Sequence, residues 1–184
     1  MNLSWIPNAI CIVRILLIVP FVAALFGGAY VTALVLIVVA GLSDGLDGFL
    51  ARTFDWRTRL GSLLDPAADK LLVVSAFLSL TKLGAVPLGL TLIVILRDVV
   101  IVSGALLYQR VAGKLEGEPI FLSKLNTLCQ LSFIVITIMH AQWQQLGSGW
   151  LTLLGATVVF TSMTSGLSYV LIWTRRAREH ATAG

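Results

Sequence analysis

The chain has 184 residues, of which 58% are hydrophobic and 12% are charged, with a formal net charge of +4. Soluble domains are about half apolar and about a quarter charged, so this composition indicates a membrane protein and excludes an ordinary water-soluble domain. The basic residues are scattered, and no segment has the charge pattern of a nucleic-acid site. The two cysteines, Cys11 and Cys129, lie within apolar runs and do not predict a disulfide framework.

Six apolar segments are each long enough for a helix that crosses the hydrocarbon core, which takes about 20 residues. In chain order they cover residues 7–27, 29–51, 60–82, 86–110, 122–142 and 149–174. The first segment has no cationic stretch ahead of it and is interrupted by Arg14, so we interpret it as a transmembrane helix rather than a signal peptide. The sequence therefore predicts an all-α integral membrane protein with six transmembrane helices, forming a single domain over residues 1–184.

The distribution of lysine and arginine predicts the orientation of these helices. An even number of spans puts both termini on one side, and the connections on that side hold nine basic residues: Arg52, Arg57, Arg59, Arg110, Lys114, Lys124, Arg175, Arg176 and Arg178. The opposite connections hold only Lys82. Because basic residues stay on the cytoplasmic side, we expect both termini to be cytoplasmic.

Four aspartates flank the connection between the second and third segments. Asp44 and Asp47 are three residues apart, and Asp65 and Asp69 are four apart, so each pair lies on one helical face. A carboxylate placed well within a span costs ~2.5–3.5 kcal/mol, and four neighbouring anions also repel one another. Oxygen ligands alone favour Mg²⁺, Mn²⁺ or Ca²⁺. Two such ions about 3.5–4 Å apart suit phosphoryl chemistry.

The residues from 44 to 69 resemble the signature of the CDP-alcohol phosphotransferases, D-x-x-D-G-x-x-A-R-x8-G-x-x-x-D-x-x-x-D. The positions that match it without a gap are Asp44, Asp47, Gly48, Ala51, Arg52, Gly61, Asp65 and Asp69. The resemblance implies that CMP of a CDP-linked donor is exchanged for an acceptor alcohol and that the protein forms a homodimer. It also implies two divalent cations, Mg²⁺ or Mn²⁺, held by the four aspartates, with Asp69 as the general base.

The same resemblance implies that Gly48, Ala51, Arg52 and Gly61 line the CDP pocket. Asn8, beside Pro7 at the start of the first segment, is a further candidate for contact with the nucleotide. No Ser-His or Cys-His pair is evident in the sequence, so we expect direct attack by the acceptor without a covalent intermediate.

Three basic residues are candidates for binding the acceptor. Arg14 and Arg97 lie inside spans, where an ionisable residue is a functional candidate by default. Alternatively, Arg14 is a structural counter-ion and Arg97 pairs with the adjacent Asp98. Lys124 begins the fifth span and could hold an acceptor phosphate together with Arg97, or it could be only an anchor at the membrane surface.

The stretch P-I-F-L-S-K-L-N-T-L-C-Q at 119–130 is similar to a P-x-F-x-S-K-x-N-T-x-x-Q segment of the CMP-forming cardiolipin synthase branch of the family. It favours CDP-diacylglycerol as donor and phosphatidylglycerol as acceptor, giving cardiolipin. Glycerol 3-phosphate, giving phosphatidylglycerophosphate, remains the alternative, followed by inositol-phosphate and serine acceptors.

The alternative outside the enzymes is a divalent-cation transporter, since acidic residues in membranes often mark ion pathways. The clustering of the acids at one surface argues against it. The sequence has no basic, serine-rich presequence, which favours a bacterial inner membrane, with the active site facing the cytoplasm.

Overall fold

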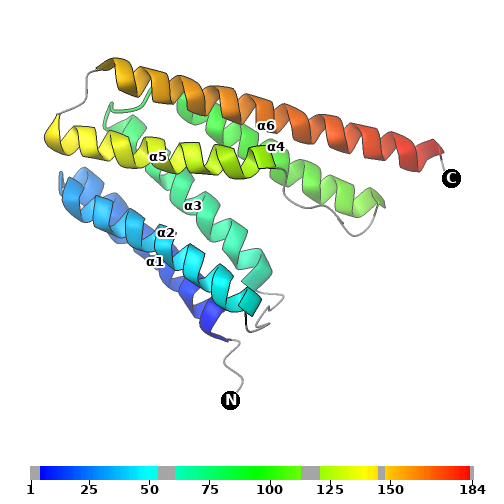
Figure 1. Ribbon diagram of the computed structural model, residues 1–184, viewed down its shortest axis with the longest axis horizontal. Helices are drawn as coiled ribbons and strands as arrows, with labels where there is room; N and C mark the ends of the chain where they lie inside the picture. The colour runs from blue at the N-terminus through cyan, green and yellow to red at the C-terminus, as the bar shows by residue number, and fades with distance from the viewer. Residues whose placement is uncertain (1–4, 54–60, 113–120, 145–147, 183–184) are drawn as a thin grey trace. The chain divides into compact units, whose positions relative to one another are not determined.

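The computed structural model describes residues 5–53, 61–112, 121–144 and 148–182, with side chains described for 9–43, 67–105, 122–144, 149–172 and 174. Six helices account for most of these residues (Figure 1): α1 (Trp5–Phe26), α2 (Tyr30–Thr53), α3 (Gly61–Lys82), α4 (Leu88–Ala112), α5 (Phe121–Trp143) and α6 (Ser148–Thr182). The prediction of six helices is confirmed, with most boundaries shifted by only a few residues. Helix α6 is the exception, because it continues past position 174 to Thr182.

Glycine residues end two of the helices. At the end of α1, Gly28 has φ +71° and the Ala29 amide donates to the Ala24 carbonyl at 2.9 Å. At the end of α3, Gly84 has φ +75° and the Ala85 amide donates to the Leu80 carbonyl at 2.9 Å. Both ends are Schellman motifs, in which a left-handed residue lets the chain turn back and satisfy the last carbonyls. These two helix ends lie at the breaks between the predicted segments 7–27 and 29–51 and between 60–82 and 86–110.

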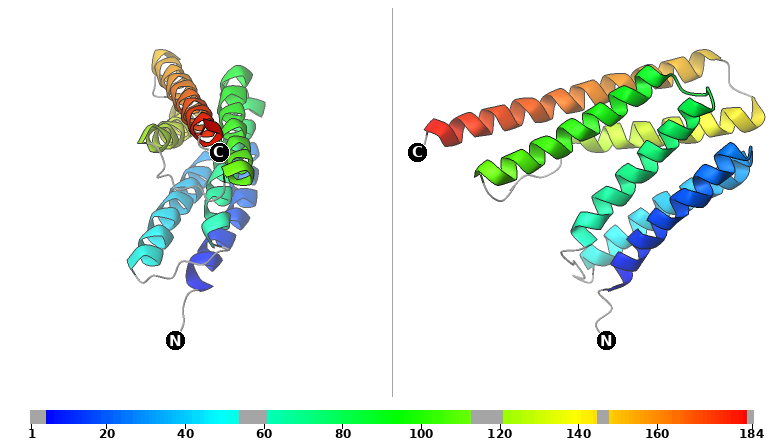
Figure 2. Two further views of the ribbon diagram at one scale, coloured as in Figure 1. Left: turned by 90° about the vertical axis from the view of Figure 1, so that its right-hand side faces the viewer. Right: turned by 180° about the vertical axis from the view of Figure 1, so that it is seen from behind.

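The chain divides into two compact units, residues 1–86 with 134–146, and residues 87–133 with 147–184. In the first unit α1 packs against both α2 and α3, and α1 and α2 run antiparallel (Figure 1). In the second unit α4 packs against α6 (Figure 2). Helix α1 is therefore a shared neighbour of the two helices that carry the four aspartates.

Small side chains face the interior of the first unit. Ala33 and Ala40 of α2 are buried, as are Ala68 and Ala76 of α3. Residues of this size let helix backbones approach closely, which is how helices associate where no water drives them together. Phe21 of α1 is also fully buried in this unit.

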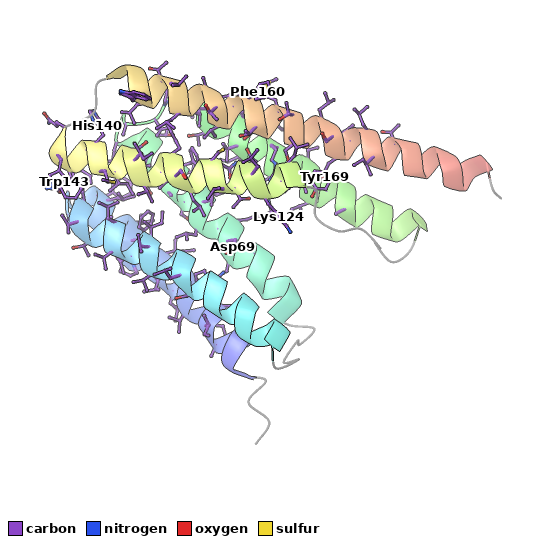
Figure 3. All side chains as sticks on the ribbon, in the orientation of Figure 1. Asp69, Lys124, His140, Trp143, Phe160 and Tyr169 are labelled. Atoms are coloured by element: carbon purple, nitrogen blue, oxygen red, sulfur yellow. The ribbon has the colours of Figure 1, made fainter. Side chains whose placement is uncertain are left out.

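Large apolar side chains cover the outside of the helices. Val19 of α1 is 71% exposed and Phe160 of α6 is 68% exposed (Figure 3). Such surfaces are unfavourable in water and suit a lipid environment. Four helical stretches are long and apolar enough to cross a membrane: Ala9–Phe26, Leu88–Ala105, Leu122–Trp143 and Gly149–Ile172. The chain is thus an integral membrane protein by its helix composition.

In α2 and α3 the described side chains cover only residues 30–43 and 67–82. Within them, Tyr30–Ser43 of α2 is an apolar stretch shorter than a membrane span. Helix α3 carries Asp65 and Asp69 in its first turns. Six membrane spans and cytoplasmic termini therefore stay predictions, whereas the six helices are observed.

The Schellman glycine of α3 allows a test of the fold. A Cβ at Gly84 would meet nothing within 4 Å, so Gly84→Ala acts only through its left-handed backbone and should cost ~1–2 kcal/mol of stability. Gly41 of α2 has equally open space and no positive φ, so Gly41→Ala should stabilise by ~0.5–1 kcal/mol. Thermal unfolding in detergent measures both, and shifts of the same sign would contradict the assignment.

Candidate active site

The four aspartates lie on helical backbone, as their spacing predicts. Asp44 and Asp47 are in the part of α2 that follows its apolar stretch, and Asp65 and Asp69 are in the first turns of α3. Residues three or four apart on a helix share a face, so each pair has the register that joint ligation requires. Of these four side chains, only that of Asp69 belongs to the described part of the structure.

The expected CDP-binding residues also lie on helices. Asn8 is in the first turn of α1, Gly48, Ala51 and Arg52 are near the end of α2, and Gly61 is the first residue of α3. Their side-chain surroundings lie outside the described residues, as do those of Asp44, Asp47 and Asp65. Their role in holding the nucleotide therefore stays a prediction.

Asp69 is held by an ion pair that crosses from α3 to α1. The Arg14 Nη1 donates to Asp69 Oδ1 at 2.7 Å. The Arg14 side chain is fully buried, whereas that of Asp69 is 42% exposed. The carboxylate thus contacts the buried arginine while keeping an open side. A carboxylate with such access can bind a cation or accept a proton from a ligand.

The residues fit a hard divalent cation by their chemistry. Asp69 offers charged oxygen atoms, and the other three predicted ligands are carboxylates too, a set that suits Mg²⁺ or Mn²⁺. No group of three or more acidic, histidine or cysteine side chains occurs among the described residues, and three of the four aspartates lie outside them. The ion site is therefore a proposal that rests on the donor set.

Arg97 of α4 lies in a buried polar cluster of the second unit. Its Nη1 donates to Asp98 Oδ1 at 2.6 Å, and its Nη2 donates to Ser123 Oγ at 2.8 Å and to Ser165 Oγ at 2.7 Å. The pairing with Asp98 was one of the two alternatives from the sequence, and it is observed. Arg97 therefore links α4 to α5 and α6, and any contact with an acceptor would add to these bonds.

Lys124 follows Ser123 at the beginning of α5 and its side chain is exposed (Figure 3). Because Ser123 accepts a hydrogen bond from Arg97, the two predicted acceptor residues are joined through one intervening serine. An exposed ammonium next to a buried guanidinium suits recognition of an anion, and it equally suits anchoring at a membrane surface.

A second polar contact joins α5 to α6. The hydroxyls of Thr161 and Ser162 donate to Asn126 Oδ1, each at 2.9 Å. Three buried nitrogens of the same unit have no hydrogen-bond partner among the described residues: Arg97 Nε, Asn126 Nδ2 and Gln130 Nε2. All three are N–H donors. The interior of this unit therefore contains unsatisfied hydrogen-bond donors that acceptor oxygens could satisfy.

Sequence reasoning missed two features of these clusters. It did not pair Arg14 with Asp69, which are 55 residues apart. It also missed the α6 hydroxyls of Thr161, Ser162 and Ser165, although T-S-M-T-S at 161–165 is an unusual density of hydroxyl residues for an apolar span. Such residues hydrogen-bond across membrane helices and could have been singled out on that ground.

Comparison with known proteins places the chain among enzymes. Residues 4–171 match the family model of CDP-alcohol phosphatidyltransferase. The CMP-forming cardiolipin synthase of Homo sapiens is 32% identical over 181 residues, covering 89% of this chain and 60% of that protein. The enzyme of the same name from Streptomyces coelicolor is 33% identical over 141 residues, covering 77% and 62%.

A relative named for a different acceptor matches as well. The chloroplastic CDP-diacylglycerol–glycerol-3-phosphate 3-phosphatidyltransferase 1 of Oryza sativa subsp. japonica is 28% identical over 159 residues, covering 76% of this chain and 48% of that protein. The chain therefore belongs to the CDP-alcohol phosphatidyltransferase family, which confirms the resemblance seen in the sequence. It spans about three fifths of the length of the human relative.

The cluster around Arg97 allows a test of its partners. Ser165→Ala removes one of the two serine acceptors of Arg97 Nη2 and should lower stability by ~0.6–1.7 kcal/mol. Among the described residues the Ser168 hydroxyl donates to the Thr164 carbonyl of its own helix, so Ser168→Ala is the matched control and should be near neutral. Thermal unfolding in detergent compares them, and equal shifts would show that Ser165 does not hold Arg97.

Proposed function

We propose that the protein transfers a phosphatidyl group from CDP-diacylglycerol to an acceptor alcohol in phospholipid biosynthesis, with release of CMP. The observation that carries the proposal is the aspartate motif, on helical backbone at matching register in a chain that belongs to this family. The ion pair of Asp69 with buried Arg14 adds a carboxylate that is both held in place and partly exposed.

The transfer requires one new bond and one broken bond at phosphorus. The acceptor hydroxyl oxygen bonds to the phosphatidyl phosphorus, and the bond from that phosphorus to the oxygen of CMP breaks. CMP leaves with the bonding electron pair, and the hydroxyl proton passes to the Asp69 carboxylate. A positioned base of this kind contributes about 10²–10⁴-fold, because an alcohol is a poor nucleophile at neutral pH.

The four aspartates Asp44, Asp47, Asp65 and Asp69 would hold two divalent cations, Mg²⁺ or Mn²⁺. When bound, such ions neutralise charge on phosphate oxygens and on the leaving CMP. Asn8, Gly48, Ala51, Arg52 and Gly61 would contact the CDP group, where the small residues leave room for the nucleotide to reach the backbone.

For the acceptor we propose recognition of a phosphate by Arg97 and Lys124. The buried Arg97 Nε, which has no hydrogen-bond partner among the described residues, supports an oxygen-rich anionic ligand. The exposed Lys124 supplies a positive charge one residue from a serine that already contacts Arg97. Phosphatidylglycerol and glycerol 3-phosphate both carry such a phosphate, so this argument alone does not distinguish them.

Phosphatidylglycerol is the acceptor we favour, with cardiolipin as product. The S-K-L-N-T-L-C-Q run at 123–130 supports it, as do relatives named cardiolipin synthase in two distant organisms. Glycerol 3-phosphate remains the alternative, supported by the rice relative. We further propose a single functional domain, a homodimer, and a bacterial inner membrane with the active site facing the cytoplasm.

One experiment tests the function directly. Purified protein is supplied with CDP-diacylglycerol and Mg²⁺, and with phosphatidylglycerol or glycerol 3-phosphate in separate reactions. We expect CMP release and cardiolipin in the first reaction, with loss of activity after chelation of the metal. If only the reaction with glycerol 3-phosphate gives a product, phosphatidylglycerophosphate, the acceptor is glycerol 3-phosphate and not phosphatidylglycerol. No CMP release with either alcohol would overturn the proposal.

Asp69→Asn tests the proposed base. The amide cannot take the proton from the acceptor hydroxyl, so kcat should fall by about 10²–10⁴-fold while the protein still inserts and binds donor. Turnover and equilibrium binding of CDP-diacylglycerol are measured on the same preparation. Near-normal kcat would remove Asp69 from this role.

Lys124→Ala tests the acceptor site. Loss of the ammonium should raise the KM for the acceptor by about tenfold, the effect of ~1.4 kcal/mol of binding, with a smaller change in the KM for CDP-diacylglycerol. Lys82→Ala, which removes an exposed ammonium that lies 5.3 Å from the Phe26 ring centroid, is the matched control. Equal effects of Lys124→Ala on both KM values would identify Lys124 as an anchor.

A further inference from the structure

The two members of the Arg14–Asp69 pair differ in exposure, and this difference indicates which of them positions the other. Arg14 lies in the middle of α1 with no exposed side-chain surface, and Asp69 is 42% exposed. The carboxylate could exchange partners at its open side, but the guanidinium is enclosed by protein. The buried arginine is therefore the fixed member of the pair, and it determines where the Asp69 carboxylate lies.

The position of Arg14 suits this task. Helix α1 packs against both α2 and α3, which carry the four aspartates. The contact at 2.7 Å is a charge-assisted hydrogen bond to one carboxylate oxygen, Oδ1. With Oδ1 engaged, the contact with α1 restrains the movement of the Asp69 carboxylate.

A simple stabilising role is a weaker explanation for the pair. Buried ion pairs frequently add little net stability, because the charges lose their hydration. The same two helices also meet through Lys82 of α3 and the Phe26 ring of α1, a contact that needs no aspartate. An arginine enclosed within α1 and bonded to the last aspartate of the motif is better explained by what it does to that aspartate.

We propose that Arg14 is a positioning residue, which holds the Asp69 carboxylate in the orientation that the transfer requires and does not itself bind the acceptor. The inference rests on the proposed function, and it replaces the expectation from the sequence that Arg14 contacts the acceptor. Partners that orient an ion ligand or a base typically contribute about 10–100-fold to metal affinity or activity.

The test compares Arg14→Leu, Arg14→Lys and the control Lys82→Gln in full-length protein. Arg14→Leu should lower kcat by about 10–100-fold and leave the KM values for donor and acceptor nearly unchanged, because the lost interaction acts on the base and not on a substrate. The kcat of Arg14→Lys should lie between those of Arg14→Leu and the wild type, because the lysine ammonium keeps the positive charge but lacks the planar guanidinium group. Lys82→Gln, which breaks the contact of the Lys82 ammonium with the Phe26 ring, should leave kcat unchanged.

Two outcomes would overturn the inference. A selective rise in the acceptor KM would show that Arg14 binds the acceptor, and an unchanged kcat would show that the pair is structural only. If Arg14→Leu does not fold, as judged by gel filtration in detergent, Arg14→Lys decides by the same criteria.

A second readout separates this inference from the proposed function. Mn²⁺ titrated into protein without substrates, and followed by electron paramagnetic resonance, should bind about 10–100-fold more weakly to Arg14→Leu than to wild type or Lys82→Gln. Equal Mn²⁺ affinity in all three would contradict positioning of Asp69, even if the wild-type enzyme is active. A wild-type protein that releases no CMP yet shows the Mn²⁺ difference would refute the function and retain the link between Arg14 and Asp69.

Discussion

A charged side chain within a bilayer has no water to solvate it, and this constraint organises both units of the structure. Ionisable residues in such places face the protein interior and pair with one another or with polar groups. Arg14 meets Asp69 at 2.7 Å in the first unit, and Arg97 meets Asp98 at 2.6 Å in the second. The Arg14–Asp69 pair crosses between two packed helices, whereas the Arg97–Asp98 pair lies within α4 and the Arg97 guanidinium also reaches serines of α5 and α6.

The two pairs differ in what they leave accessible. Both members of the Arg97–Asp98 pair are nearly enclosed, with side chains 5% and 10% exposed, and serines from α5 and α6 complete the cluster. In the Arg14–Asp69 pair only the cation is enclosed. The first arrangement is suited to joining three helices, whereas the second presents an oriented carboxylate at an open surface. The two pairs thus use the same chemistry in surroundings that differ in their access to the surface.

Much of the fold followed from local sequence. The apolar lengths predicted six helices, and the glycines at 28 and 84 end α1 and α3 through left-handed turns that few other residues adopt. The register of the aspartates also followed, because positions three or four apart share a helix face whatever the tertiary structure. Asp98 as partner of Arg97 was predictable for a different reason, since the two residues are adjacent in the sequence.

The remaining contacts could not be predicted because they depend on which helices pack together. Arg14 and Asp69 are 55 residues apart, and nothing in their flanking sequences says that α1 lies against α3. Ser165 reaches Arg97 across 68 residues for a similar reason. Small residues such as Ala33 and Ala68 permit close packing without specifying a partner. Sequence patterns thus identified the family and the candidate site residues, and the packing identified partners of Asp69 and Arg97.

The length of α6 has a consequence for the C-terminal region. At 35 residues the helix extends about 52 Å at 1.5 Å per residue, whereas the hydrocarbon layer is about 30 Å thick. Even when moderately tilted, a helix of that length extends beyond the hydrocarbon layer. The residues after the candidate span, which ends at Ile172, include Arg175, Arg176 and Arg178. The helical extension is therefore cationic, as suits the level of the lipid phosphates. A probe attached there would report on the headgroup layer rather than on the acyl chains.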